Sequence, residues 1–120
     1  MAGAEAEARK NNWNVVIAIL DSGGNLVLLQ RMDNTQIASV VVAQRKAYSA
    51  VAWRRPGKAF ADRLTAGGAG LQVLGAEGAV PLEGGLPIVA DGKIIGSIGV
   101  SGVTSEQDAQ VASAGLAALK

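Results

Sequence analysis

The strongest constraint on the fold lies near the C-terminal end, where Asp91-Gly92 joins two apolar runs. An Asp-Gly pair in this setting is typical of a type I′ hairpin turn, because both central residues of that turn need positive φ. Thr104 and Gln107 follow with the spacing of a capping box, in which two side chains satisfy free N–H groups at a helix start. Residues 83–119 are therefore predicted to form strand, turn, strand, glycine loop and helix.

The rest of the chain predicts further antiparallel pairing. Residues 15–20 are a continuous apolar run, predicted as a strand buried on both faces, and residues 26–31 return after Gly23-Gly24 as its hairpin partner. Helices are predicted over 2–12, 36–53, 58–64 and 105–119, a flexible loop over 65–70, and a short edge strand over Val80-Pro81-Leu82. This order indicates one α+β domain over 1–120, with an antiparallel sheet of about five strands and helices packed on it.

The helix predicted over 36–53, with N-cap candidates at 33–35, is apolar on most of its circumference. Tyr48 falls on the predicted core face, while Arg45, Lys46 and Ser49 form only a narrow polar stripe. A helix of this kind cannot lie on one sheet with its back in water. We therefore expect another subunit to cover it.

Composition excludes several function classes. The chain has 120 residues and a net charge of +1, which offers no basic face for nucleic acid. It contains no histidine and no cysteine, which excludes Ser-His-Asp and Cys-His nucleophiles, ordinary zinc sites and disulfides. No metal site is predicted. No apolar run is long enough to span a membrane, and the acidic N-terminus lacks the shape of a signal peptide, so we expect a cytoplasmic protein.

Three glycines precede the last predicted helix with the spacing Gly96-x-x-Gly99-x-x-Gly102. This spacing matches neither of the usual glycine-rich phosphate loops. Glu106 and Asp108 already place negative charge at the positive end of the helix, where a phosphate would have to bind. The glycines are therefore interpreted as sites of strand bending and close packing.

Charged side chains of opposite sign indicate a pocket for a small anion. Arg31 and Lys46 are predicted to face Glu83, Glu106 or Asp108 across it, where a cation would hold a carboxylate. Surface ion pairs are the alternative for the cations, and a solvated loop acid is the alternative for Glu83. The predicted ligand-binding residues are Arg31, Lys46, Glu83, Gly84, Gly85, Ser101, Gly102, Thr104 and Glu106.

Several motifs, taken together and in order, resemble the GlcG/HbpS-like family, which includes the C-terminal domain of PduO. They are the run over 16–26 ending in Asp-x-Gly-Gly-x-Leu, Arg31-Met32-Asp33, Ala43-x-x-Lys46-Ala47, Glu83-Gly84-Gly85-x-Pro87, the glycine-rich stretch over 91–102, and Gln107-Asp108. The resemblance implies a PAS- or profilin-like fold and homo-oligomers, as dimers, tetramers or octamers. It also implies haem as a candidate cofactor, with Thr104 in the region matching a threonine reported to ligate haem in some relatives.

Three functions follow as hypotheses. One is a structural or interaction subunit, in which the glycines only permit tight assembly. The first of the other two is an oligomeric small-molecule-binding protein, with haem or a small organic acid as ligand. The second is a small catabolic enzyme, a lyase, isomerase or hydrolase acting on an organic acid. In the second case Glu83 or Asp108 would be the general base, and Arg31 or Lys46 would hold the substrate carboxylate.

Overall fold

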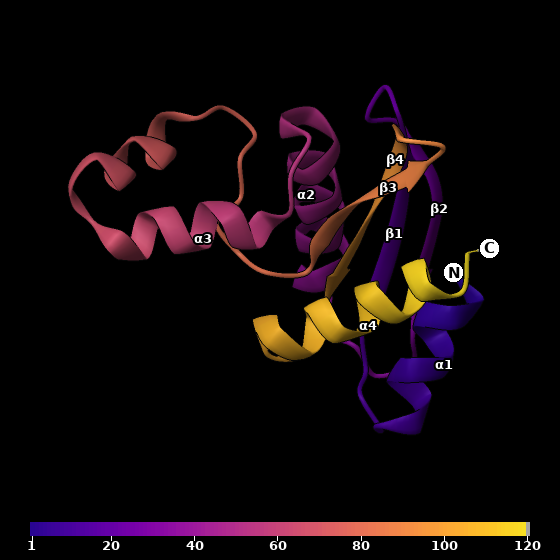
Figure 1. Cartoon of the computed structure of the whole chain (residues 1–120). Helices are drawn as coiled ribbons and strands as arrows, with labels where there is room; N and C mark the ends of the chain where they lie inside the picture. The colour runs from indigo at the N-terminus through magenta and orange to yellow at the C-terminus, as the bar shows by residue number, and fades with distance from the viewer. Residues whose placement is uncertain (120) are drawn as a thin grey trace.

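The computed structural model describes residues 1–119 as a four-stranded antiparallel sheet with helices on both faces (Figure 1). The elements are α1 (Ala2–Lys10), β1 (Val16–Asp21), β2 (Leu26–Arg31), α2 (Ala38–Trp53), α3 (Gly57–Ala66), the 3-10 helix η1 (Gly68–Gly75), β3 (Gly85–Ala90), β4 (Lys93–Ser101) and α4 (Ser105–Ala117). The strand order is β2-β1-β4-β3, with β2 and β3 at the edges. The predicted α+β fold is confirmed, but the strand count is four and not five.

Strand β1 is buried on both faces, as its continuous apolar run predicts. Val15, just before the strand, and Ile17 pack with residues of α1 and α4 on one face of the sheet. Val16 and Ala18 pack against α2 on the other face. Side chains alternate in direction along a strand, so one run of apolar residues supplies two cores.

The local signals that anchor the C-terminal hairpin and helix are confirmed. Asp91 and Gly92 have φ values of 52° and 76°, as the type I′ turn requires. The Thr104 hydroxyl accepts from the backbone N–H of Gln107 at 3.2 Å, and the Gln107 side chain accepts from the N–H of Thr104 at 3.3 Å. The capping box therefore fixes where α4 begins, directly after the glycine-bent end of β4.

Helix α2 lies unusually close to the sheet because glycines face it. A Cβ on Gly99 would lie 2.1 Å from the carbonyl oxygen of Ala43, and a Cβ on Gly85 would lie 2.2 Å from that of Lys46. Only a strand surface without side chains at these points admits the helix backbone. The helix face turned to the sheet is correspondingly built of small residues, and the Ser97 hydroxyl donates to the carbonyl of Ala47 at 2.6 Å.

This close packing places three side chains of α2 on the opposite side from the one predicted, while Arg45 of the predicted polar stripe is exposed as expected. Tyr48, predicted on the core side, is 46% exposed and lies beside Gly24 and Gly78. Lys46 and Ser49, predicted in the polar stripe, are both buried. Hydropathy alone therefore assigns the wrong side chains to the interior. The helix also begins at Ala38 with Ile37 as N-cap, and not from a cap at 33–35.

The predicted edge strand at Val80-Pro81-Leu82 is wrong. Residues 80–82 form no strand, and the N–H of Val80 donates to the hydroxyl of Ser49 at 3.0 Å instead of to a neighbouring strand. Pro81 has no N–H to give a ladder. The segment is held against α3, since a Cβ on Gly57 would lie 2.2 Å from the carbonyl oxygen of Leu82.

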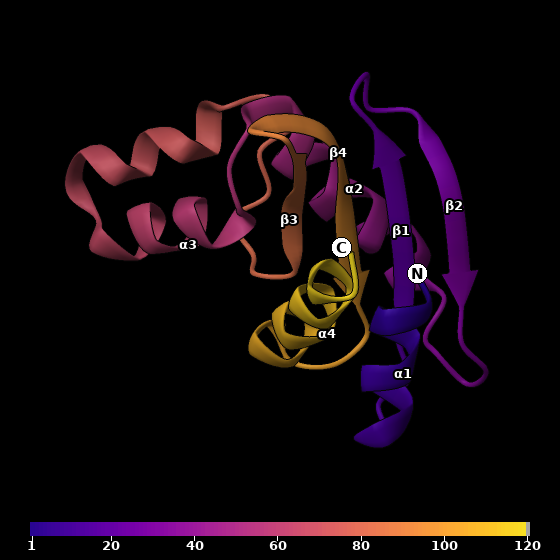
Figure 2. The ribbon, with the colours of Figure 1, turned by 45° about the vertical axis from the view of Figure 1, so that its right-hand side comes forward.

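Helix α3 and η1 form an arm that projects away from the sheet (Figure 2). The predicted flexible loop over 65–70 instead contains the end of α3 and the start of η1. Phe60 anchors the arm by edge-to-face packing with Trp53, at a centroid distance of 5.9 Å, and the Arg55 guanidinium lies 5.6 Å from the same ring centroid. No helix within residues 1–119 is long and apolar enough to cross a membrane.

Candidate functional site

Two of the predicted site residues form a buried ion pair between α2 and α4. The Lys46 ammonium lies 2.9 Å from a carboxylate oxygen of Asp108, and the two side chains are 2% and 3% exposed. The ammonium also donates to the carbonyl of Val100 at 3.0 Å, and the second Asp108 oxygen accepts from the N–H of Val103 at 3.1 Å. The pair thereby ties both helices to the end of β4.

Gly84 closes over this pair. Its φ is +123°, and a Cβ there would lie 2.9 Å from the Lys46 ammonium nitrogen and 2.7 Å from the carbonyl oxygen of Val100. A side chain at this position would meet both the strained backbone and the ion pair. The glycine pair 84–85 is thus explained by close approach to Lys46, whether or not a ligand binds nearby.

Burial raises the pKa of the Asp108 carboxyl above its ordinary value. The Lys46 ammonium acts in the opposite direction, as do the N–H groups of Val103 and Gly102. A buried carboxyl with a shifted pKa beside a cation is often found in active sites. The same arrangement also occurs in purely structural ion pairs.

The remaining predicted residues divide into two groups. Ser101 is buried, and its hydroxyl donates to that of Ser39 at 3.1 Å on the same face of α2 as Lys46. Arg31 is exposed and lies apart from the ion pair, donating to the carbonyl of Thr35. The Thr104 hydroxyl is engaged in the helix cap. The structure therefore groups Lys46, Asp108, Gly84, Gly85, Ser101 and Gly102, but not Arg31.

Glu83 is half-buried and Glu106 is exposed, and the negative charges of both carboxylates influence Lys58 on the arm. The pKa of Lys58 on α3 is raised chiefly by its hydrogen bond to Asp62, and further by the negative charges of Glu83 and Glu106. These two acids therefore lie within electrostatic reach of Lys58. None of the predicted site residues lines either of the two cavities described next.

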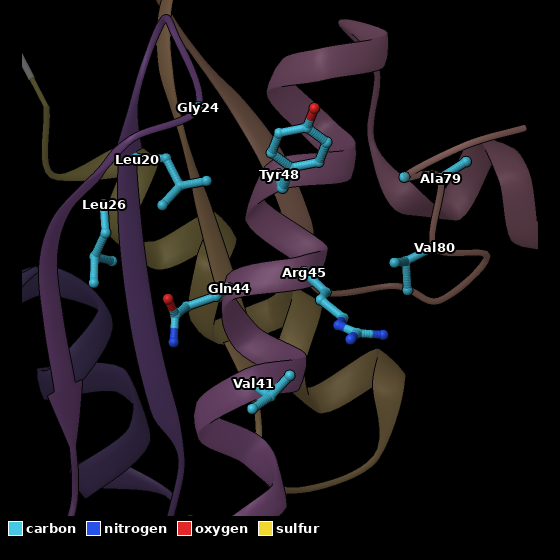
Figure 3. Close-up of a pocket in the computed structure, with 10 residues that line it drawn as sticks. Leu20, Gly24, Leu26, Val41, Gln44, Arg45, Tyr48, Ala79 and Val80 are labelled. Carbon is cyan, nitrogen blue, oxygen red and sulfur yellow. The ribbon is translucent and has the colours of Figure 1, made fainter.

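The larger cavity lies over the outer face of α2, between the β1–β2 hairpin and the segment that leads from η1 to β3 (Figure 3). Its volume is about 570 Å³ and it is open to solvent. It is lined by Leu20, Gly24, Leu26, Val41, Gln44, Arg45, Tyr48, Gly78, Ala79 and Val80. A smaller cavity of about 220 Å³ is lined by Arg9, Asn12, Trp13, Asn14 and Met32.

The Tyr48 ring is held at one end of the larger cavity between two glycine turns. A Cβ on Gly24 would lie 3.1 Å from the ring, and a Cβ on Gly78 would lie 2.8 Å from it. Both glycines have positive φ, of 82° and 78°. The two turns thus leave a slot that a tyrosine ring fills, although Gly24 and Gly78 are far apart in sequence.

Sequence reasoning missed this cavity because its walls come from three separated segments. One indication of the cavity is present in the sequence of α2, where Gln44, Arg45 and Tyr48 place three polar groups within little more than one turn. The hydropathy pattern assigned Tyr48 to the core instead. Within residues 1–119 there is no group of three or more His, Cys, Asp or Glu side chains that could hold a metal ion.

Comparison with known families gives a match over almost the whole chain. Residues 1–117 match the family model described as "Haem degrading protein HbpS-like". Protein GlcG of Escherichia coli K12 is 44% identical over 101 residues, which cover 84% of this chain and 74% of GlcG.

Solved structures show the same fold. The crystal structure of Klebsiella pneumoniae protein ORFY has a TM-score of 0.88 and 34% identity, covering 99% of this chain and 86% of that one. The structure of the PduOC:heme complex has a TM-score of 0.89 and 31% identity, covering 99% of this chain and 88% of that one. One similar protein has thus been solved with haem bound.

Proposed function

Because this chain belongs to the HbpS-like family, we propose that it is a homo-oligomeric protein that binds a small organic molecule. The observation that carries the proposal is the open cavity of about 570 Å³ on α2, which combines apolar walls with a few polar groups. Small-molecule sites typically have volumes of about 300–1,000 Å³ and this mixture of linings.

One similar protein, PduOC, has been solved in complex with haem, but the residues of this chain do not fit haem well. Histidine and cysteine are absent. Met1 and Met32 pack in or against the N-terminal core cluster, and the Thr104 hydroxyl is occupied by the helix cap. Tyr48 is the one side chain lining the larger cavity that belongs to a residue type known as an axial iron ligand. We therefore favour an organic acid as ligand and assign no chemistry to iron.

The exposed apolar surface supports self-association. Ile37, directly before α2, is exposed, and so are Val27 and Leu28 on the edge strand β2. An unpaired edge strand with apolar side chains is a ready site for pairing with another chain. Light scattering during size-exclusion chromatography should give a dimer or a larger closed assembly. A monomer at micromolar concentration would contradict this part of the proposal.

Ligand binding is tested by titrating the purified protein with haem and with a panel of small carboxylates, using calorimetry and absorption spectroscopy. Saturable binding of at least one carboxylate is expected. If no compound in the panel produces heat or a spectral change, the binding function is rejected.

A catalytic role for the buried cluster is the second candidate. The observation that favours it is the Asp108 carboxyl of raised pKa, paired with Lys46 and covered by the loop of Glu83 and Gly84. In this case Glu83→Gln should abolish turnover of an organic acid while leaving its binding intact. Full activity in that variant would exclude Glu83 as the base.

A further inference from the structure

Building on the proposed function, we infer that the larger cavity takes an organic carboxylate with an apolar body. The carboxylate would bind the Arg45 guanidinium, and the body would lie over α2 with one end against the Tyr48 ring. This site lies on the face of α2 opposite the buried Lys46–Asp108 pair.

The charge of the cavity favours an anion. Among the residues that the structure describes, Arg45 is the only charged side chain lining the cavity, and no carboxylate lines it. Within residues 1–119 the Arg45 guanidinium makes no hydrogen bond or salt bridge to another side chain or to the backbone. A planar guanidinium with its donors uncommitted is suited to bidentate recognition of a carboxylate.

The walls of the cavity favour an apolar body behind that charge. Leu20 and Leu26 form the side nearest the hairpin, Val80 lies on the opposite side, and Val41 lies on α2 between them (Figure 3). Figure 3 also shows that Arg45 extends toward the side of Ala79 and Val80, while Gln44 extends toward the hairpin. A ligand lying across the helix would thus meet the cation at one side and apolar surface over the rest.

Tyr48 is prepared for contact with such a body before any ligand arrives. Its ring is confined by Gly24 and Gly78, so little side-chain freedom remains to be lost on binding. An aromatic ring fixed in this way provides a flat surface for an apolar or aromatic group. Gly24 and Gly78 act here as positioning residues, because their missing side chains leave the slot for the ring.

Ligands of other classes would leave either the Arg45 guanidinium or the apolar walls of the cavity without a binding partner. A neutral apolar molecule would leave the Arg45 guanidinium without a partner. A small hydrophilic acid such as acetate would leave the apolar walls in contact with water. The combination of one cation with apolar walls therefore points to a molecule that has both parts.

The experiment compares three probes by calorimetry and by amide chemical-shift changes: 1-naphthoate, its neutral counterpart 1-naphthalenemethanol, and acetate. Naphthoate should bind at least about tenfold more tightly than the alcohol, because a charged hydrogen bond commonly contributes a tenfold effect or more. Acetate should show no saturation at concentrations where naphthoate saturates. The largest shifts should fall on residues 44–48 and 78–80.

Three arginine variants assign the effect. Arg45→Met should weaken naphthoate binding about tenfold or more and leave alcohol binding unchanged, while Arg45→Lys should restore part of the loss. Arg63→Met removes another exposed arginine, from α3 and outside the cavity lining, and is the matched control, for which no change is expected. Tyr48→Ala should weaken both naphthoate and the alcohol, because it removes the shared apolar contact.

The outcomes separate this inference from the proposed function. Equal naphthoate binding by wild type and Arg45→Met would overturn the inference and leave the binding function standing. The same conclusion would follow if the wild-type protein bound haem or another carboxylate but did not bind naphthoate. Absence of binding to every compound would overturn both.

Discussion

Two lysine–aspartate pairs in this molecule have the same length and opposite surroundings. Lys46 and Asp108 meet at 2.9 Å in the interior, where their side chains are 2% and 3% exposed. Lys58 and Asp62 meet at 2.9 Å on α3, where their side chains are 58% and 66% exposed. The first pair lies between the helices and the sheet, and the second lies on the projecting arm. The comparison shows that distance alone says little about what an ion pair contributes.

The two ion pairs differ because their charges differ in hydration. On the arm, water solvates each charge whether or not the pair forms, so the pair adds little. In the interior, each charge has lost its hydration and depends on its partner and on nearby backbone groups. Lys46 and Asp108 are accordingly bonded on several sides, to Val100 and to Val103 as well as to each other.

The largest predicted effect is the loss of one interior charge. Lys46→Met should lower the free energy of unfolding by about 3–5 kcal/mol, because Asp108 then remains buried without its cation. Lys58→Met is the matched control on the arm and should leave the urea midpoint unchanged within error. Equilibrium urea unfolding, followed by tryptophan fluorescence, measures both.

The double variant Lys46→Met, Asp108→Asn sharpens the test. Here no buried charge remains, and the asparagine oxygen can still accept from the N–H of Val103. The double variant should therefore recover much of the stability that Lys46→Met alone loses. Additive losses in the double variant would show that the two charges act independently, contrary to the packing described above.

The second prediction compares two glycines of positive φ in the same two regions. Gly84 has a φ of +123° and is crowded by Val100 and Lys46, whereas Gly67, at the end of α3, has a φ of +70° with no atom within 4 Å of an added Cβ. Both Gly84→Ala and Gly67→Ala carry backbone strain. Gly84→Ala should cost about 1–3 kcal/mol more, because it also overpacks the interior. Equal losses in urea unfolding would mean that the contacts around Gly84 relax without cost.

The third prediction compares two hydroxyls that donate to helix carbonyls. Ser97 donates to Ala47 at 2.6 Å in the interior, and Thr65 donates to Ala61 at 2.9 Å on the arm. Ser97→Ala should cost about 1 kcal/mol, the usual net value of a buried hydrogen bond. Thr65→Ala should change the stability by less than about 0.5 kcal/mol, as expected of a surface substitution. A larger loss for Thr65→Ala would remove the distinction between the regions.

The features that could be predicted from sequence are those set by residues close together in the chain. The strand pairs, the Asp91-Gly92 turn and the capping box at Thr104 depend on residues close together in the chain, and all are confirmed. The family and the α+β architecture follow from these ordered motifs. The arm was harder to predict, because η1 over Gly68–Gly75 is a glycine-rich stretch whose sequence is also typical of a loop.

The faces of α2 could not be predicted because they are decided by the opposite strands. Lys46 is interior because Gly84 and Gly85 leave room for its backbone and side chain, and because Asp108 arrives from α4. Tyr48 is exterior because Gly24 and Gly78 leave a slot for it there. Neither fact can be read from the helix sequence alone. Opposite charge predicted that Lys46 would meet an acid, and this acid is Asp108, but the outer cavity was not predicted.

The smallest predicted effect concerns two aspartates in different surroundings, Asp108 on α4 and Asp21 at the end of β1, whose pKa values move in opposite directions. Burial raises the pKa of Asp108. Backbone N–H donation by Asn25 and Gly23, with help from the Asn25 side chain, outweighs desolvation and lowers the pKa of Asp21 in the β1–β2 turn. A lowered pKa means that Asp21 stabilises the fold above its unfolded pKa, near pH 4, and that this contribution is lost as the pH falls through the folded value. The stability difference between wild type and Asp21→Asn should therefore shrink as the pH is lowered below about 4 in urea unfolding. A difference that stays constant over this range would mean that the Asp21 turn does not favour the charged carboxylate, and that the two aspartates do not differ as their surroundings indicate.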